Sequence, residues 1–117
     1  MAERAAPTYS IEKREIVADS PDYRVQVMTL AAGECVPWHY HTHVDDLFFC
    51  LEGPMTVETR APRGVHHLAP GQSLIVPAKT AHYVSGRDSG RCRFLLAQGG
   101  SYDFVPVGGQ PAPKRPN

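Results

Sequence analysis

The sequence has no excess of charge of either sign, since 12 lysine and arginine residues balance 12 aspartate and glutamate residues. This balance provides no electrostatic basis for binding nucleic acid or an anionic membrane surface. The sequence also lacks an apolar run long enough to cross a bilayer, and its first residues lack the apolar core of a secretory signal. We therefore expect a soluble cytoplasmic protein with no nucleic-acid or membrane partner.

Cysteine is scarce, with three residues in an odd number and no CxxC spacing. That pattern argues against a disulfide framework and against a zinc knuckle. Cys50 and Cys92 lie inside apolar runs, so we interpret them as small buried hydrophobic residues. The sequence also shows no supported Ser-His-Asp arrangement, no phosphate-binding glycine loop and no nucleotide-binding fingerprint.

A helical apolar period is missing as well, and short alternating or apolar runs separated by glycine and proline take its place. These runs cover residues 23–30, 47–51, 55–60, 73–77 and 91–98. Many short strands with frequent turn signals predict an all-β protein, a single antiparallel β-sandwich or jelly-roll barrel.

The length of 117 residues corresponds to one domain. The first ten residues are polar and rich in alanine, and the last ten are rich in proline and glycine. We expect flexible segments at 1–10 and 108–117, and a folded barrel over 11–107.

One run carries information about assembly. Residues 47–51, with the sequence LFFCL, are apolar at every position, which predicts that both faces of this strand are buried. The core of a single small barrel covers only the inward face. The outward side chains of Leu47, Phe49 and Leu51 then need another cover. A second copy of the chain in a homodimer is the simplest, and a buried loop or helix would also serve.

Histidine is sparse, yet three of the six histidines stand at alternate positions, 39, 41 and 43. Residues two apart in a strand point to the same face, about 6.6 Å apart, so His39 and His41 could bind one metal ion. His82 follows a proline-led turn after the run at 73–77. We expect it to open a strand antiparallel to the preceding one and to reach the same site in a small barrel.

Two spaced motifs in this region resemble those of the cupin superfamily, in its small single-domain bacterial form. The first motif is a glycine, five residues, His-x-His, a carboxylate, six residues and a glycine. The second is a glycine, five residues, Pro-x-Gly, two residues, a histidine, three residues and an asparagine. The matching positions are Gly33, His39, His41, Asp46 and Gly53 in the first motif, and Gly71, Pro77 and His82 in the second.

Three positions depart from the family pattern. Asp46 replaces the usual glutamate and is one methylene shorter, which could shift or weaken metal binding. Lys79 replaces the motif glycine, and we interpret this as a turn that needs no positive φ. Gly86 stands at the usual asparagine, which is a structural position in the family.

The resemblance implies a metal site formed by His39, His41, Asp46 and His82. The count to Gly53 favours Asp46 over its neighbour Asp45, which we interpret as a solvated carboxylate or one that orients a histidine. Three imidazoles and one carboxylate suit divalent iron, manganese, nickel, cobalt, copper or zinc, and leave one or two positions open on a six-coordinate ion.

Cupins serve many unrelated activities, so the resemblance narrows the chemistry only to a class. We expect a metal-dependent enzyme acting on a small organic molecule, either a dioxygenase or a Lewis-acid isomerase, lyase or cyclase. The alternative is a non-catalytic cupin that binds a small ligand or keeps a structural metal. The side chains expected to line the pocket are Phe48, Cys50, His43 and Tyr83.

Overall fold

The computed structural model describes residues 9–107, and ten β-strands account for most of this part of the chain. In order they are β1 (Lys13–Ser20), β2 (Tyr23–Leu30), β3 (Cys35–Tyr40), β4 (Asp45–Glu52), β5 (Met55–Thr59), β6 (Gly64–Leu68), β7 (Ser73–Val76), β8 (His82–Gly86), β9 (Cys92–Gly99) and β10 (Val105–Pro106). A short 3-10 turn, η1 (Arg87–Ser89), joins β8 to β9. No helix within residues 9–107 is long and apolar enough to cross a membrane.

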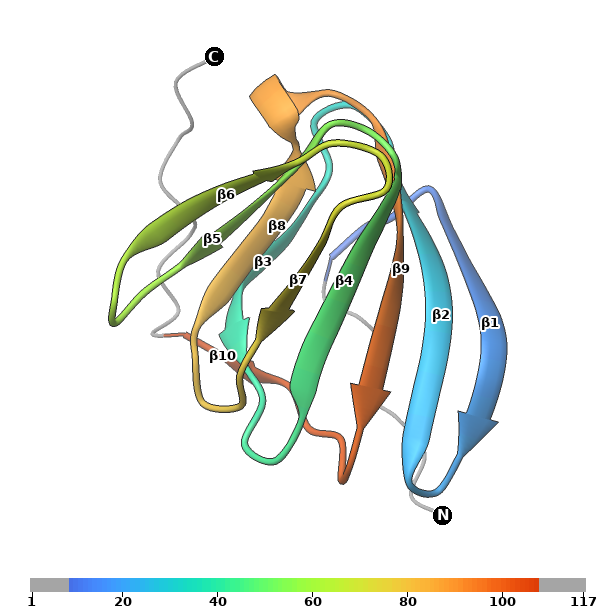
Figure 1. Cartoon of the computed structure of the whole chain (residues 1–117), viewed down its shortest axis with the longest axis vertical. Helices are drawn as coiled ribbons and strands as arrows, with labels where there is room; N and C mark the ends of the chain where they lie inside the picture. Colours follow the sequence, from blue (N-terminus) through green and yellow to red (C-terminus); the bar gives the residue numbers. More distant parts are fainter. Residues whose placement is uncertain (1–8, 108–117) are drawn as a thin grey trace.

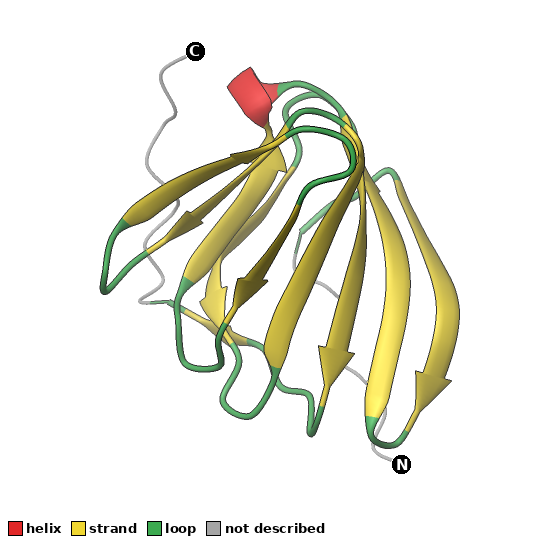
Figure 2. Cartoon of the chain, in the orientation of Figure 1, coloured by secondary structure: helices red, strands yellow, loops and turns green. Residues whose placement is uncertain are grey.

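The strands form two five-stranded sheets that face each other (Figure 1). The first sheet has the order β1-β2-β9-β4-β7 and the second the order β10-β3-β8-β5-β6. Every pair of neighbouring strands is antiparallel. Figure 2 shows the result, two layers of strands joined by short loops, and confirms the predicted all-β sandwich.

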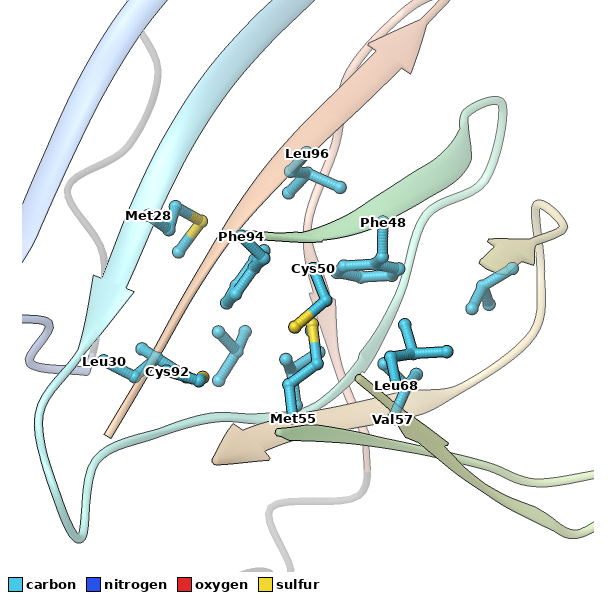
Figure 3. Packing of buried hydrophobic residues seen from close by; sticks show 13 residues of the cluster. Met28, Leu30, Phe48, Cys50, Met55, Val57, Leu68, Cys92, Phe94 and Leu96 are labelled. Carbon is cyan, nitrogen blue, oxygen red and sulfur yellow. The ribbon is translucent and has the colours of Figure 1, made fainter. Parts of the chain in front are cut away.

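Side chains that alternate along the strands fill the space between the sheets. In β9, Phe94 and Leu96 point inward and are 0% and 7% exposed, while Leu95 between them is only half-buried. Figure 3 shows how these side chains pack against those of β2, β4 and β5. The buried apolar cluster consists of Met28, Leu30, Val36, Phe48, Cys50, Met55, Val57, Leu68, Val76, Val84, Cys92, Phe94 and Leu96.

The LFFCL run is buried on one face only within a single chain. Phe48 and Cys50 point into the core, whereas Leu47 and Phe49 are 36% and 38% exposed on the outer face of the first sheet. Ile75 lies directly opposite Leu47 on β7 and is 61% exposed. The expectation that a second chain covers this face remains a prediction.

The expectation that the strand at His82 lies beside the preceding one is wrong. β7 pairs with β4 in the first sheet, whereas β8 pairs with β3 and β5 in the second. The chain crosses between the sheets over 77–81, where Lys79 adopts a φ of +69°. This crossing carries His82 to the strand next to His39.

Tyr9 is the first residue that the structure describes, and it contacts the end of the chain's ordered barrel. Tyr9 falls within the segment expected to be flexible, yet its ring stacks on Phe104 with the ring centroids 6.0 Å apart. The strand β1 that follows lies outside the runs that predict strands, and in the structure its residues alternate only weakly in burial. Residues 1–8 and 108–117, where flexible ends are also predicted, lie outside the described part of the chain.

Candidate metal centre

The four residues that the motifs indicate meet between the two sheets. His39 on β3 and His82 on β8 are direct register partners, and His41 follows two residues after His39. Asp46 faces them from the start of β4 in the other sheet. Their ligand atoms all lie within 4.8 Å of one another, and the residues are only 1% to 3% exposed.

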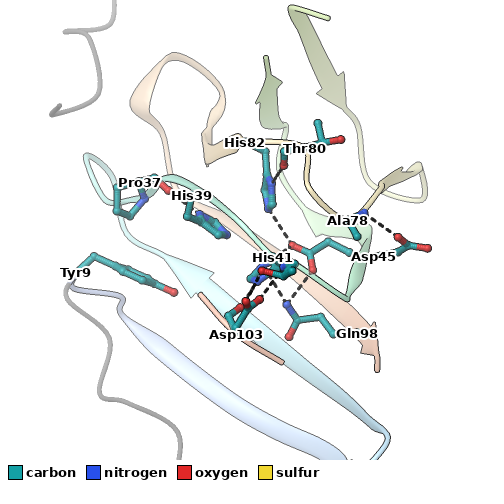
Figure 4. A network of polar contacts seen from close by, with 12 residues as sticks. Tyr9, Pro37, His39, His41, Asp45, Ala78, Thr80, His82, Gln98 and Asp103 are labelled. Carbon is teal, nitrogen blue, oxygen red and sulfur yellow. Dashed lines mark hydrogen bonds and ion pairs between the residues drawn. The ribbon is translucent and has the colours of Figure 1, made fainter. Parts of the chain in front are cut away.

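In each of the three imidazole rings, the Nδ1 atom contacts a backbone carbonyl oxygen (Figure 4). The Nδ1 atom of His39 lies 2.7 Å from the carbonyl oxygen of Pro37, and that of His82 lies 2.9 Å from the carbonyl oxygen of Thr80. The Nδ1 atom of His41 contacts the carbonyl oxygen of Asp103. A carbonyl only accepts hydrogen bonds, so each Nδ1 carries the hydrogen, and in a neutral ring Nε2 keeps its lone pair.

These lone pairs converge on the carboxylate of Asp46. The Nε2 atoms of His82 and His41 lie 2.9 Å and 3.2 Å from Asp46 Oδ2. Two acceptors at this separation repel each other unless a cation lies between them, either a proton or a metal ion. Two ligand atoms bound to one ion at about 2.1 Å and at right angles are about 3 Å apart. The donor set and its spacing therefore fit a divalent transition metal.

Without a metal, the pKa values of His39, His41 and Asp46 differ from their usual values. Desolvation by burial, together with the neighbouring His82, lowers the pKa of His39 to about 3. Burial also opposes the charged form of His41, but the hydrogen bond and charge of Asp46 outweigh it and raise the pKa of His41. Burial disfavours ionised Asp46 too, yet His41 and His82 hold its pKa well below the usual range. Asp46 is therefore ionised at neutral pH.

The structure distinguishes the two adjacent aspartates. Asp46 is buried, whereas Asp45 is exposed and its Oδ1 accepts a hydrogen bond of 2.8 Å from the backbone N–H of Ala78. This hydrogen bond holds the loop between β7 and β8 against the start of β4. Among the described residues, no hydrogen bond joins Asp45 to a histidine ring. Its expected alternative role in orienting a histidine is not what the structure shows.

Of the four side chains expected to line the pocket, the structure places only Phe48 there. Cys50 lies on the same face of β4 but deeper, about 13 Å from Asp46 along the strand, among core residues. His43 is exposed in the turn after β3. Tyr83 follows His82 directly, so it points to the opposite face of the sheet, where it packs on Trp38.

The sequence reasoning missed Gln98, which lies directly opposite Asp46 on β9. Its Nε2 donates a hydrogen bond of 2.8 Å to Asp46 Oδ1, while its buried Oε1 has no hydrogen-bond partner among the described residues. Gln98 therefore orients the carboxylate and offers an unused acceptor to a bound molecule. The available signal was a polar residue at a core-facing position of an alternating strand.

A cavity lined by three of the four residues, His39, His41 and Asp46, encloses about 330 Å³ of space between side chains, part of it open to solvent. Its apolar lining includes Phe48, Phe94, Leu96 and Phe104, and Phe104 stacks on the ring of His39 with the centroids 4.3 Å apart. A water-sized sphere enters only a small part of this space, so the cavity is narrow. The site thus combines four metal-ligand side chains with a narrow cavity of mixed polar and apolar lining.

Two departures from the motif have physical explanations. Lys79 does adopt positive φ, contrary to the expectation, and its N–H donates a hydrogen bond of 2.7 Å to the carbonyl oxygen of His41. Gly86 has no room for any side chain, because a Cβ there would lie 1.8 Å from the carbonyl oxygen of Gly90. The asparagine usual at this position could not fit without a shift of the backbone.

Comparisons with known proteins agree with this architecture. Residues 26–97 match the sequence model of the family described as Cupin domain (Cupin_2). A search of curated protein sequences finds no match. Among solved structures of similar fold is KdgF from Halomonas sp., with a TM-score of 0.65 at 22% identity, covering 74% of this chain and 78% of that one.

Two further solved structures carry enzyme names. The DMSP lyase DddQ from Ruegeria pomeroyi has a TM-score of 0.70 at 18% identity, covering 84% of this chain and 53% of that one. Oxalate decarboxylase from Lactobacillus farciminis has a TM-score of 0.69 at 12% identity, covering 85% of this chain and 33% of that one. At these identities the likeness concerns the fold alone, but the family match spans more than half of the sequence, and the chain belongs to the cupin family.

Proposed function

We propose that the protein is a metal-dependent enzyme that acts on a small organic molecule. The metal is a divalent transition ion held by His39, His41, Asp46 and His82. The observation that carries this proposal is the convergence of the Nε2 atoms of His82 and His41 on the buried carboxylate of Asp46, at 2.9 Å and 3.2 Å. Iron, manganese, nickel, cobalt, copper and zinc all accept this donor set, so the identity of the ion has to be measured.

Such an ion, when bound, supplies either Lewis-acid polarisation of a substrate oxygen or redox chemistry with dioxygen. The protein's own residues define how a substrate lies. The aromatic lining of Phe48 and Phe104 excludes water, and Gln98 fixes the carboxylate of Asp46. Its free Oε1 can accept a hydrogen bond from a substrate hydroxyl. The names of the lyase and the decarboxylase of similar fold support catalysis by such a barrel.

Elemental analysis of protein purified without chelator tests the metal site. We expect near-stoichiometric transition metal in the wild type and its loss in His41→Ala, whose ring is 3% exposed within the cluster. His43→Ala is the matched control, because it removes an exposed histidine two residues away. Circular dichroism verifies that the variants fold. Wild type that stays metal-free after reconstitution with each of the six metals contradicts the proposal.

Substrate turnover separates the enzyme from a non-catalytic cupin. The identified metal directs the screen, toward oxygen consumption for iron or copper and toward elimination or isomerisation for zinc, manganese, nickel or cobalt. We expect turnover that is lost in His82→Ala and on removal of the metal, and kept in His43→Ala. A stoichiometric metal with no turnover in either screen favours a binding or structural role instead.

A further inference from the structure

We propose that the substrate is a small organic anion and that Arg14 binds its carboxylate. This inference rests on the proposed function, because it assigns the substrate class of the same cavity. Arg14 lies on β1, and its side chain lines the cavity that also holds His39, His41 and Asp46. The cavity thus contains a guanidinium group in addition to the metal-binding residues.

The guanidinium is held by two neutral groups. Its Nη1 donates a hydrogen bond to Oε1 of Gln26, and its Nη2 lies 3.5 Å from the hydroxyl oxygen of Tyr9. Gln26 is only 2% exposed, and its strand β2 pairs with β1 so that Arg14 is opposite Met28, on the inward face. Arg14, Gln26 and Tyr9 all line the cavity and form what we call the Arg14 group.

Within residues 9–107, the charge of Arg14 has no carboxylate partner. The ion pairs found over residues 9–107 include none with Arg14, whereas Arg93 on the same sheet pairs with Glu15 and Glu52. A part-buried cation without an anion has lost hydration that no opposite charge replaces. Guanidinium binds a carboxylate through two parallel hydrogen bonds, which are stronger than those to neutral oxygens. A substrate carboxylate would therefore bind Arg14 better than the Gln26 amide does.

The size and lining of the cavity limit the rest of the molecule. The space of about 330 Å³ includes part that is open to solvent, and a water-sized sphere enters only a small part of it, so only a very small molecule fits without movement of the lining side chains. Its apolar side chains include Met28, Phe94 and Leu96. These features fit a short carbon skeleton with a carboxylate for Arg14 and a second oxygen function near His41 and Asp46.

Titration of zinc-reconstituted protein with malonate, succinate and glutarate tests the inference. Isothermal titration calorimetry gives the dissociation constants, and succinamide, of nearly the same shape but uncharged, is the ligand control. We expect at least one dicarboxylate to bind at least tenfold more weakly to Arg14→Gln than to wild type. Arg14→Lys, which keeps the charge, should give an intermediate value. Arg93→Gln, which removes an arginine already paired with carboxylates, should bind like wild type.

Zinc content, measured for every variant, separates the two proposals. Loss of carboxylate affinity in Arg14→Gln at unchanged zinc content supports the Arg14 group. Equal dicarboxylate affinity in Arg14→Gln and wild type, or no dicarboxylate binding to zinc-loaded wild type, overturns it. If wild type takes up no zinc or other metal, the proposed function fails. The same titration of metal-free protein then decides the role of Arg14 by the same comparison.

Discussion

The buried histidine His39 makes the stability of the metal-free protein depend on pH in a way that can be calculated. Burial lowers its folded-state pKa from 6.5 to about 3. Between these values the unfolded chain binds a proton at this residue that the folded chain does not bind. Stability therefore falls as the pH drops below about 6.5, and the loss is complete only near the folded pKa.

The size of the effect follows from the two pKa values. At about pH 5 the unfolded ring is almost wholly protonated and the folded ring almost wholly neutral. Relative to about pH 7.5, the difference amounts to about 1.5 pH units at about 1.36 kcal/mol each, or about 2 kcal/mol. His41 contributes with the opposite sign. Its pKa is raised in the folded state, so its stabilisation is present below 6.5 and is lost as the pH rises through the folded value.

The variant His39→Gln isolates the first contribution. Urea unfolding of chelator-treated protein at the two pH values gives the change in the free energy of unfolding for wild type and variant. We expect acidification to destabilise the wild type by about 2 kcal/mol more than the variant. His39 is neutral in this range, so its replacement leaves the charges around His41 nearly unchanged. His43→Gln corrects for the loss of a histidine ring. Equal changes in wild type and His39→Gln would refute the reasoning.

Three other predictions concern single positions. Gly86→Ala, whose Cβ would meet backbone at 1.8 Å, should lower the free energy of unfolding by about 1–3 kcal/mol, and Gly99→Ala, with nothing within 4 Å, should not. Urea unfolding of both checks this, and equal stabilities would contradict it. In a competition titration, Asp46→Asn should bind metal at least about tenfold more weakly than wild type, while Asp45→Asn should keep wild-type affinity. Equal losses of affinity in the two variants would contradict the assignment of Asp46 as the ligand. Light scattering should give twice the chain mass of 12.9 kDa for wild type and that mass itself for Phe49→Lys. A wild-type monomer at all concentrations refutes the homodimer.

The strands and the four clustered residues could be predicted because their signals are local. Alternation over a few residues indicates which face of a strand is buried, and the motif spacing needs only counting. Tyr83 was misplaced although the rule that excludes it is local too, since adjacent residues of a strand face opposite sides. Cys50 has the right face, but the rise of a strand over four residues already places it about 13 Å from Asp46, too deep to line the pocket.

The contribution of partners distant in sequence could not be predicted. Gln98 is 52 residues from Asp46 in the sequence. Arg14 lies on β1, and the sequence of this strand does not indicate that the side chain reaches the cavity. Their positions depend on the register of β9 against β4 and of β1 against β2. The positive φ of Lys79 could not be predicted for a different reason. A lysine gives no sign of positive φ, and the hydrogen bond from its N–H to His41 shows what the turn supports.

The interior of the barrel has a polar end and an apolar end, and both sheets change from polar to apolar along the direction of their strands. On β9 the inward residues run from Gln98 through Leu96 and Phe94 to Cys92, and on β4 from Asp46 through Phe48 to Cys50. The register places Asp46 opposite Gln98 and Cys50 opposite Phe94, so polar and apolar ends coincide. Burial of the apolar end stabilises the fold, since each well-packed side chain contributes roughly 1.5–3 kcal/mol.

The polar end contributes differently. It contains a carboxylate with two close histidine nitrogens, a glutamine oxygen that has no hydrogen-bond partner within residues 9–107, and a lysine with positive φ. The glutamine oxygen and the lysine backbone cost free energy, and such costs collect where a site requires them. A barrel selected for stability alone would continue its apolar packing to this end. The presence of buried polar side chains and a free glutamine oxygen at one end of an otherwise apolar interior is therefore an argument for ligand binding there that is independent of the motif.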